Sequence, residues 1–299
     1  MPDWISHASL AGGVQAAMDA AAAATALDDS AAAALAAAFY KDFRTGQLAG
    51  TLGAGWSKIL QGSQGGGYDG MVWHHPASRT LVVVNRGTEG FQSLPDWIAN
   101  VGAQILHQPG PQLHNAVDLL RDGFLHAPQD RIDQILICGH SLGGALADVQ
   151  AAVGRSLLIQ AGVGNPPPIR AVGVASAGFK TAGLALAGQR GLTIDLKADI
   201  VHYIRAEDAV PHLLDHETFG KEIPVASVYE ARLGYSAGAH PAPQWQRIAD
   251  FLREHTASLY WRFLSEGEGR HVWYSRAHEA YLAKAGTPAK RWGKRPKDW

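Results

Sequence analysis

The sequence has little of several features that would mark particular classes of protein. Its one cysteine, Cys138, excludes an intrachain disulfide. The 26 basic and 27 acidic side chains leave a net charge of -1, so nothing global favours nucleic acid or another strongly charged partner. No uncharged apolar stretch approaches the roughly 20 residues of a membrane span, and the N-terminus, with Asp3 and no Lys or Arg before Lys41, lacks the charge pattern of a secretory signal. We therefore expect no nucleic-acid partner and, by default, a cytoplasmic location, although export without a cleaved signal would leave no trace.

The chain is long and apolar enough to bury one large core. It has 299 residues, 46% of them hydrophobic, with no internal repeat and no clear linker, and α/β folds of this length are often one domain. We therefore expect a single domain over residues 1–299. Its first part, residues 1–50, is rich in alanine and predicts two packing helices, broken near residues 27–30, where Asp29 or Ser30 could cap the second.

β-rich runs alternate with helix-like stretches along the rest of the chain. After a turn at residues 61–70, we expect a hairpin whose second arm is a central strand, followed by three further strands and a helix. The expected segments are the hairpin arms 71–75 and 80–88, the strands within 131–140, 166–178 and 198–213, and the helix 141–158. Such alternation predicts the α/β class with a mostly parallel sheet, in which active residues lie just beyond the carboxyl ends of strands.

A serine stands between two glycines where one of these strands gives way to the helix. The run Gly139-His140-Ser141-Leu142-Gly143 fits the nucleophile elbow, a strained turn that exposes a serine oxygen and needs small flanking residues. Five-residue patterns also arise by chance, so the strand, the helix and the partners have to be found independently. Cys138, in the apolar run just before the elbow, is expected to be a buried structural thiol.

The acid and base partners are less well marked. Asp208 follows an apolar, strand-like run and precedes Val210 and Pro211, which favour an extended or turn geometry; a carboxylate there could orient an imidazole, or could be an ordinary surface acid in a turn. The chain order serine, acid, histidine leaves several histidines open as the base. They are His212, His216, His240, His255, His271 and His278.

Four separate segments of the chain resemble the class 3 lipases, a family of α/β-hydrolases, over about residues 68 to 265. The segments are "LVVVNRGTEG" (81–90), "DWIAN" (96–100), "GHSLGGALA" (139–147) and "EDAVPHL" (207–213). The resemblance implies an α/β-hydrolase fold with a mostly parallel central sheet flanked by helices. It also implies a serine carboxylic-ester hydrolase that acts on acyl lipids without cofactor or metal.

The resemblance also assigns roles to residues. It implies Ser141 as the nucleophile and Asp208 as the acid, with the backbone N–H of Leu142, at the start of a helix, and Thr88 forming the oxyanion hole. "HTASLYWRFL" is similar to a pattern of plant and bacterial members and favours His255 as the base. "HEAYL" is similar to a shorter fungal pattern and keeps His278 open.

Other positions remain open after the resemblance is taken into account. His240 and His271 are the remaining candidates for the base, and Arg86 is expected to hold its turn through hydrogen bonds to backbone carbonyls rather than to stabilise charge directly. The apolar residues within 89–100 could cover an acyl site or touch a lipid surface, or simply pack in the core. The basic tail 283–299, with two tryptophans, could contact anionic lipid transiently, although such tails are more often solvated.

The chemistry of the substrate is not fixed by the sequence. Acyl pockets are built from ordinary apolar side chains, so triacylglycerol, phospholipid and small esters are not distinguished. The same chemistry on a short-chain ester or thioester is one alternative, and a catalytically idle hydrolase fold that serves as an interaction module is another. The oligomeric state is equally open.

Overall fold

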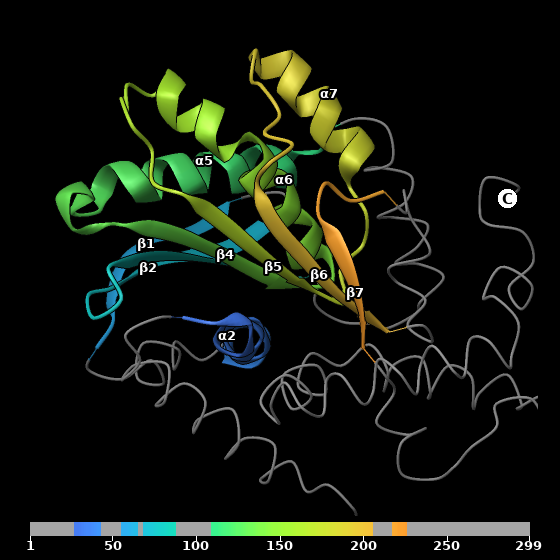
Figure 1. Cartoon of the computed structure of the whole chain (residues 1–299), viewed down its shortest axis with the longest axis horizontal. Helices are drawn as coiled ribbons and strands as arrows, with labels where there is room; N and C mark the ends of the chain where they lie inside the picture. Colours follow the sequence, from blue (N-terminus) through green and yellow to red (C-terminus); the bar gives the residue numbers. More distant parts are fainter. Residues whose placement is uncertain (1–26, 43–54, 65–67, 88–108, 206–216, 226–299) are drawn as a thin grey trace, which may run out of the picture.

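A computed structural model describes residues 27–42, 55–64, 68–87, 109–205 and 217–225 of the chain (Figure 1). Its elements, in chain order, are α2 (Asp29–Asp42), β1 (Ser57–Gln64), β2 (Tyr68–His75), β3 (Thr80–Asn85), α5 (Pro111–His126), the short 3-10 helix η2 (Gln129–Arg131), β4 (Gln134–His140), α6 (Leu142–Gln160), β5 (Ile169–Val174), α7 (Lys180–Arg190), β6 (Asp199–Arg205) and β7 (Lys221–Val225).

The seven strands form one sheet whose spatial order follows the chain. The pairs β1–β2 and β2–β3 are antiparallel, and every pair from β3 to β7 is parallel. Because connections between parallel strands are right-handed and each step goes the same way across the sheet, the helices α5, α6 and α7 all lie on one face (Figure 1). Helix α2 covers the opposite face, so the predicted mostly parallel sheet flanked by helices is confirmed.

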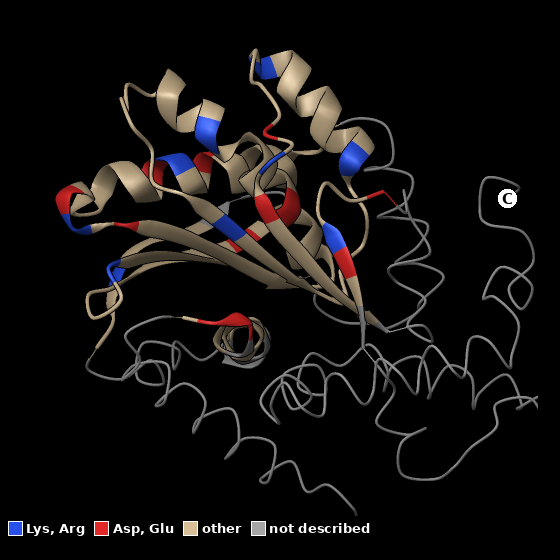
Figure 2. Cartoon of the chain, in the orientation of Figure 1, with Lys and Arg blue, Asp and Glu red and all other residues tan. Residues whose placement is uncertain are grey.

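The sheet is apolar on both faces and separates two layers of core. On β3, Leu81 and Val83 belong to the layer under α5, α6 and α7, whereas Val82 and Val84 belong to the layer under α2. Strands covered on both faces read as continuous apolar runs, which is why the sequence marked them well. The charged side chains lie mainly on the helices and at strand ends, and the middle of the sheet is almost free of them (Figure 2).

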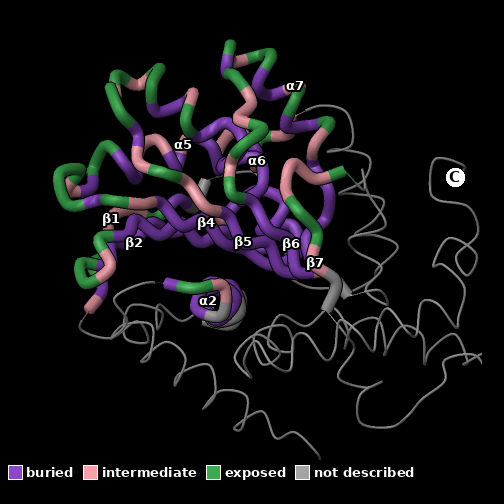
Figure 3. The backbone as a smooth tube through the Cα atoms, in the orientation of Figure 1, coloured by how far each residue is buried: buried purple, intermediate pink, exposed green. Residues whose placement is uncertain are grey.

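Helix α6 is buried along most of its length (Figure 3). Its length and apolar composition would suffice to cross a membrane, but 83% of that stretch is buried inside the molecule. A helix that is apolar all round and covered by its own chain is a core helix. It packs against β4, β5 and α5.

Helix α2 confirms the expected second alanine-rich helix, but its cap differs from the prediction. The side chain of Asp28, the residue before the helix, accepts a hydrogen bond of 2.8 Å from the backbone N–H of Ala31. Asp29 instead accepts hydrogen bonds from the guanidinium of Arg170 and from the hydroxyl of Tyr203. The cap prediction of Asp29 or Ser30 was therefore wrong, because Asp29 faces charged and polar groups on the sheet below.

Part of the expected turn at residues 61–70 is strand. β1 continues to Gln64 and β2 begins at Tyr68, so only residues 65–67 separate them in the chain. The hairpin of β2 and β3 was predicted correctly, with its turn at residues 76–79. The first expected N-terminal helix, the segment 89–100 and the tail 283–299 lie outside the described residues, and the extent of the single domain stays a prediction.

Candidate active site

Ser141 occupies the strained turn between β4 and α6 that the sequence predicted. Its backbone angles are φ 58 and ψ -125, a conformation that residues other than glycine rarely adopt. The turn is held from two sides. The N–H of Ser141 donates to the carbonyl of Val174 on β5 at 2.9 Å, and its carbonyl accepts from Gly144 in α6 at 3.0 Å. Backbone strain of this kind persists only where the surrounding structure imposes it, and it concentrates at functional sites.

The glycines of the motif are required by close contact. A Cβ on Gly139 would lie 2.3 Å from the carbonyl oxygen of Gly143, and a Cβ on Gly143 would lie 2.3 Å from the carbonyl oxygen of Asn85 on β3. A Cβ on Gly144 would lie 2.9 Å from Oγ of Ser176. Strand, elbow and helix therefore approach as closely as the elbow motif demands.

The start of α6 provides an environment that favours negative charge beside Ser141. Leu142 is the first residue of this helix, and the N–H groups of a first helical turn have no partner within the helix. They also form the positive end of the helix dipole. The backbone of Leu142 thus lies where the oxyanion role requires, while the role itself stays a prediction.

Ser141 is more enclosed than the motif predicts. Its relative exposure is 3%, and its neighbours in the chain, His140 and Leu142, are also buried. The expectation of a solvent-exposed serine was therefore wrong.

Arg86, in the turn after β3, is bound to the neighbouring strand β2. Its backbone N–H donates to the carbonyl of Asp69 at 3.0 Å, and Nη1 donates to the carboxylate of the same residue at 3.0 Å. The Arg86 side chain is only 5% exposed. The expected structural role agrees with this position, and one described partner of the side chain is the carboxylate of Asp69. Together with the backbone hydrogen bond, this ion pair ties the turn after β3 to β2.

A second strained residue lies beside the elbow. Ala175, directly after β5, has φ 50, and its N–H donates to the carbonyl of Tyr203 on β6 at 2.9 Å. Since Val174 pairs with His140 in the sheet, Ala175 and Ser141 leave adjacent strands at the same edge. Two strained turns side by side mark this edge as the candidate site. The sequence did not indicate that Ala175 is strained, because a run of small residues does not predict a positive φ.

The remaining predicted site residues lie outside the described residues. Asp208 lies three residues after the end of β6, so the strand that was predicted to precede it is confirmed. The carboxylate of Asp208 lies outside the described residues. Thr88 and the favoured base His255 also lie outside, as do the alternatives His278, His240, His271, His212 and His216. The structure therefore brings together Ser141, Leu142 and the Arg86 turn, and the predicted triad stays a prediction.

Cys138 lies in β4, before the elbow, and was expected to be a buried structural thiol. Burial raises the pKa of the Cys138 thiol, which is fully covered, as the structural interpretation predicts.

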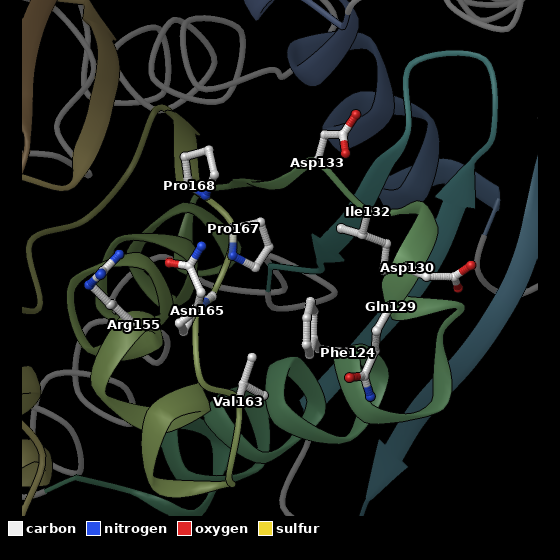
Figure 4. A pocket seen from close by; sticks show the side chains of 11 residues that line it. Phe124, Gln129, Asp130, Ile132, Asp133, Arg155, Val163, Asn165, Pro167 and Pro168 are labelled. Carbon is white, nitrogen blue, oxygen red and sulfur yellow. The ribbon is translucent and has the colours of Figure 1, made fainter.

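A pocket formed by the end of α5, the segment before β4 and the prolines before β5 is lined by charged groups such as Asp130 and Arg155 (Figure 4). It lies at the amino ends of β4 and β5, whereas Ser141 follows the carboxyl end of β4, so this pocket is not part of the candidate site.

Comparisons with known proteins agree with the sequence resemblance. The model of the class 3 lipase family matches residues 120–217, which hold the elbow and the segment with Asp208. No curated protein matches the chain significantly. Among solved structures, the native Rhizomucor miehei lipase propeptide complex is 17% identical with a TM-score of 0.44, over 74% of this chain and 70% of its own.

Two Penicillium structures are similar at the same level. A triacylglycerol lipase from Penicillium expansum is 17% identical with a TM-score of 0.45, over 69% of this chain and 80% of its own. A mutant form of MDLA from Penicillium cyclopium is 16% identical with a TM-score of 0.45, over 84% of this chain and 96% of its own. Structural similarity at this level does not show which reaction the chain catalyses. The family match and the geometry of the elbow bear on that question instead. The chain is therefore similar to the class 3 lipase family over residues 120–217, and its mostly parallel sheet flanked by helices is that of the α/β-hydrolase fold.

Proposed function

We propose that the protein is a serine carboxylic-ester hydrolase that cleaves acyl lipids through an acyl-enzyme. The observation that supports this most directly is the geometry of Ser141, a strained residue between a buried strand and the amino end of a helix, within the stretch 120–217 that matches the class 3 lipase family. The close approach of strand, elbow and helix accounts for the three glycines around it. An idle scaffold has no need of such a strained turn.

In the proposed reaction, Oγ of Ser141 attacks the ester carbonyl. The base, His255 by the favoured pattern, takes the serine proton and then delivers it to the leaving alcohol, and Asp208 orients the imidazole and stabilises its charged form. Negative charge develops on the carbonyl oxygen, where the N–H of Leu142 and the donors of Thr88 stabilise it. Water then hydrolyses the acyl-enzyme by the same steps, releasing the fatty acid.

The substrate class is the finer part of the proposal. The family supports an acyl ester, and triacylglycerol and phospholipid are the preferred substrates, with short-chain esters and thioesters as the alternative. The overall charge of -1 gives no reason to favour a charged soluble substrate.

The test combines active-site labelling with product analysis. Purified protein is incubated with a fluorophosphonate probe and, separately, with mixed triacylglycerol and phospholipid, with Ser141→Ala as the control. We expect labelling of Ser141 and release of fatty acid by the wild type only. A folded wild type that is neither labelled nor active would favour the idle scaffold, and activity on small esters alone would favour the esterase alternative. Residual turnover above a few per cent in Ser141→Ala would remove the serine assignment.

A further inference from the structure

Helix α6, which begins directly after Ser141, carries two fully buried polar side chains, Asp148 and Gln150, each 0% exposed. Because each residue of a helix turns by about 100°, positions two apart point to nearly opposite sides. Burying a polar group without a hydrogen bond is unfavourable, so such side chains are retained where they bind something specific. Their partners therefore show what they do.

Gln150 joins the helix to the end of β3. Its Oε1 accepts a hydrogen bond of 2.6 Å from Nδ2 of Asn85, and its Nε2 donates to the carbonyl of Ala116 in α5 at 2.5 Å. The Oδ1 of Asn85 in turn accepts from the hydroxyl of Tyr68 at 2.8 Å. Asn85 is the last residue of β3, and its carbonyl lies against Gly143 of the elbow. A buried chain of hydrogen bonds thus ties the end of β3 to the helix that follows the nucleophile.

Asp148 joins the same helix to β6. Its Oδ1 lies 3.0 Å from Nε2 of His202, both side chains are fully buried, and its Oδ2 accepts from the backbone N–H of Phe219 at 3.0 Å. β5 lies between β4 and β6, and Gly173 on β5 pairs with His202. A Cβ on Gly173 would lie only 2.4 Å from Nδ1 of His202, so the missing side chain gives the imidazole room to reach α6 across β5.

The two strands bound in this way are those that lead to the other proposed site residues. The chain continues from β3 through Arg86 and Gly87 to Thr88, and from β6 to Asp208. We propose that Gln150 and Asp148 are positioning residues, which hold the nucleophile helix in register with the strand that supplies the second oxyanion donor and with the strand that supplies the triad acid. This inference rests on the proposed function.

Hydrogen bonds can position α6 because, unlike apolar contacts, they depend on direction. Apolar packing is not directional, so away from the elbow it fixes the position of α6 on the sheet less sharply than hydrogen bonds do. Hydrogen bonds lose strength when distance or angle departs from the optimum, and these are enclosed in an apolar layer where no water can replace them. Since a displacement of about 1 Å can reduce turnover by about 100-fold, contacts that fix the helix at this level bear on the rate.

The first test separates positioning from simple stability on the β3 side. Gln150→Met keeps the length of the side chain and removes both hydrogen bonds, and we expect kcat on a p-nitrophenyl ester to fall by about 10-fold or more with little change in KM. The matched control is Leu158→Ala, a fully buried residue of the same helix about 25 Å from the elbow. It should lose stability and keep its kcat, measured at a temperature where circular dichroism shows both variants folded.

The second test uses the β6 side and a different readout. In the double variant Asp148→Leu/His202→Leu both polar partners become apolar, which avoids leaving an unpaired buried charge. Displacement of the acid strand weakens support for the protonated base, so the acid limb of kcat/KM should move to lower pH. Gln150→Met should leave that limb in place. His202→Gln, whose amide can still donate to Asp148, should restore most of the wild-type profile.

The outcomes separate this inference from the proposed function. A wild type without turnover and without labelling of Ser141 overturns the proposed function. An active wild type in which Gln150→Met has the same kcat as Leu158→Ala overturns the positioning role, as does a double variant with an unshifted acid limb. If Gln150→Met does not fold, Tyr68→Phe decides, because it removes only the hydroxyl that binds Asn85. A severalfold loss of kcat supports the inference, and an unchanged kcat contradicts it.

Discussion

At the scale of single residues, the elbow offers a sharp contrast with a glycine elsewhere in the fold. In Gly143→Ala the new Cβ would meet the carbonyl oxygen of Asn85 at 2.3 Å, and that oxygen belongs to the backbone. We expect this substitution to destabilise the fold by about 1–3 kcal/mol and to reduce ester turnover by about 100-fold, because the strand, elbow and helix have to move apart. Differential scanning calorimetry and initial rates measure the two effects.

The control for that variant is Gly188→Ala in α7. No atom lies within 4 Å of a Cβ there, and the position is exposed within a helix. Alanine should therefore stabilise the protein by about 0.5–1 kcal/mol and leave turnover unchanged. Equal behaviour of the two variants would contradict the close packing described for the elbow.

The choice of the base is also a question about single residues. His255→Ala should reduce turnover by several orders of magnitude, whereas His278→Ala should leave it nearly intact, because loss of the base removes both activation of Ser141 and proton transfer to the leaving group. Steady-state rates of the two variants decide between them. The reverse result would support the shorter fungal pattern, and two active variants would direct attention to His240 and His271.

The residues that the sequence identified make contacts within a short stretch of the chain, whereas those that it missed contact residues far away in the sequence. Ser141 and its glycines form one local turn, so a short motif suffices to find them. The partners of Gln150 and Asp148 lie 65 and 54 residues away in the chain, at Asn85 and His202. No local pattern marks such contacts, because a polar residue in a helix reads as an exposed one until the fold is known.

At the scale of elements, α2 is attached to the sheet through its first residue. Asp29 accepts from Nη2 of Arg170 at 2.5 Å and from the hydroxyl of Tyr203 at 2.5 Å, so it joins the helix to β5 and β6. Burial, followed by the hydrogen bond to Asp29, raises the pKa of Tyr203. This hydroxyl therefore stays a donor at physiological pH.

Asp29→Ala should weaken the fold more than removal of the neighbouring cap. We expect a loss of about 2 kcal/mol, because a charged partner of two buried or half-buried groups disappears. Asp28→Ala removes only the hydrogen bond to Ala31 and should cost about 1 kcal/mol. Urea unfolding of both variants measures the difference. An Asp28 variant that is the less stable of the two would mean that the cap, and not the contact with the sheet, fixes α2.

The elements that could be predicted from the sequence are the ones buried on both faces. β4, β5 and β6 read as apolar runs, and α6 follows from the elbow. β1 was missed because its glycine, serine and glutamines have low strand propensity, and pairing with β2 stabilises it instead. α5 and α7 were not among the predicted elements, although both bury apolar residues at helical spacing, with polar residues between them.

At the scale of the whole molecule, two histidines, one buried and one half-buried, link the stability of the fold to pH. Burial lowers the pKa of His74, which is 4% exposed, and burial together with the positive charge of Arg190 lowers the pKa of His114. Nη2 of Arg190 lies 2.9 Å from Nδ1 of His114, and the same guanidinium binds Asp118. Protonation of His114 would therefore place two positive charges in contact between α5 and α7.

These histidines predict that the fold loses stability in mild acid. A histidine whose folded pKa lies below its unfolded value of about 6.5 binds fewer protons in the folded state, so its contribution is complete above that pH and declines as the pH falls below it. We expect Tm to be nearly constant above about pH 7.5 and to fall by a few degrees by about pH 5.5. In the double variant His74→Leu/His114→Gln, this acid loss should be clearly smaller, as measured by calorimetry across the same range. A Tm that rises in acid, or an unchanged slope in the double variant, would show that other groups control the pH dependence of the fold.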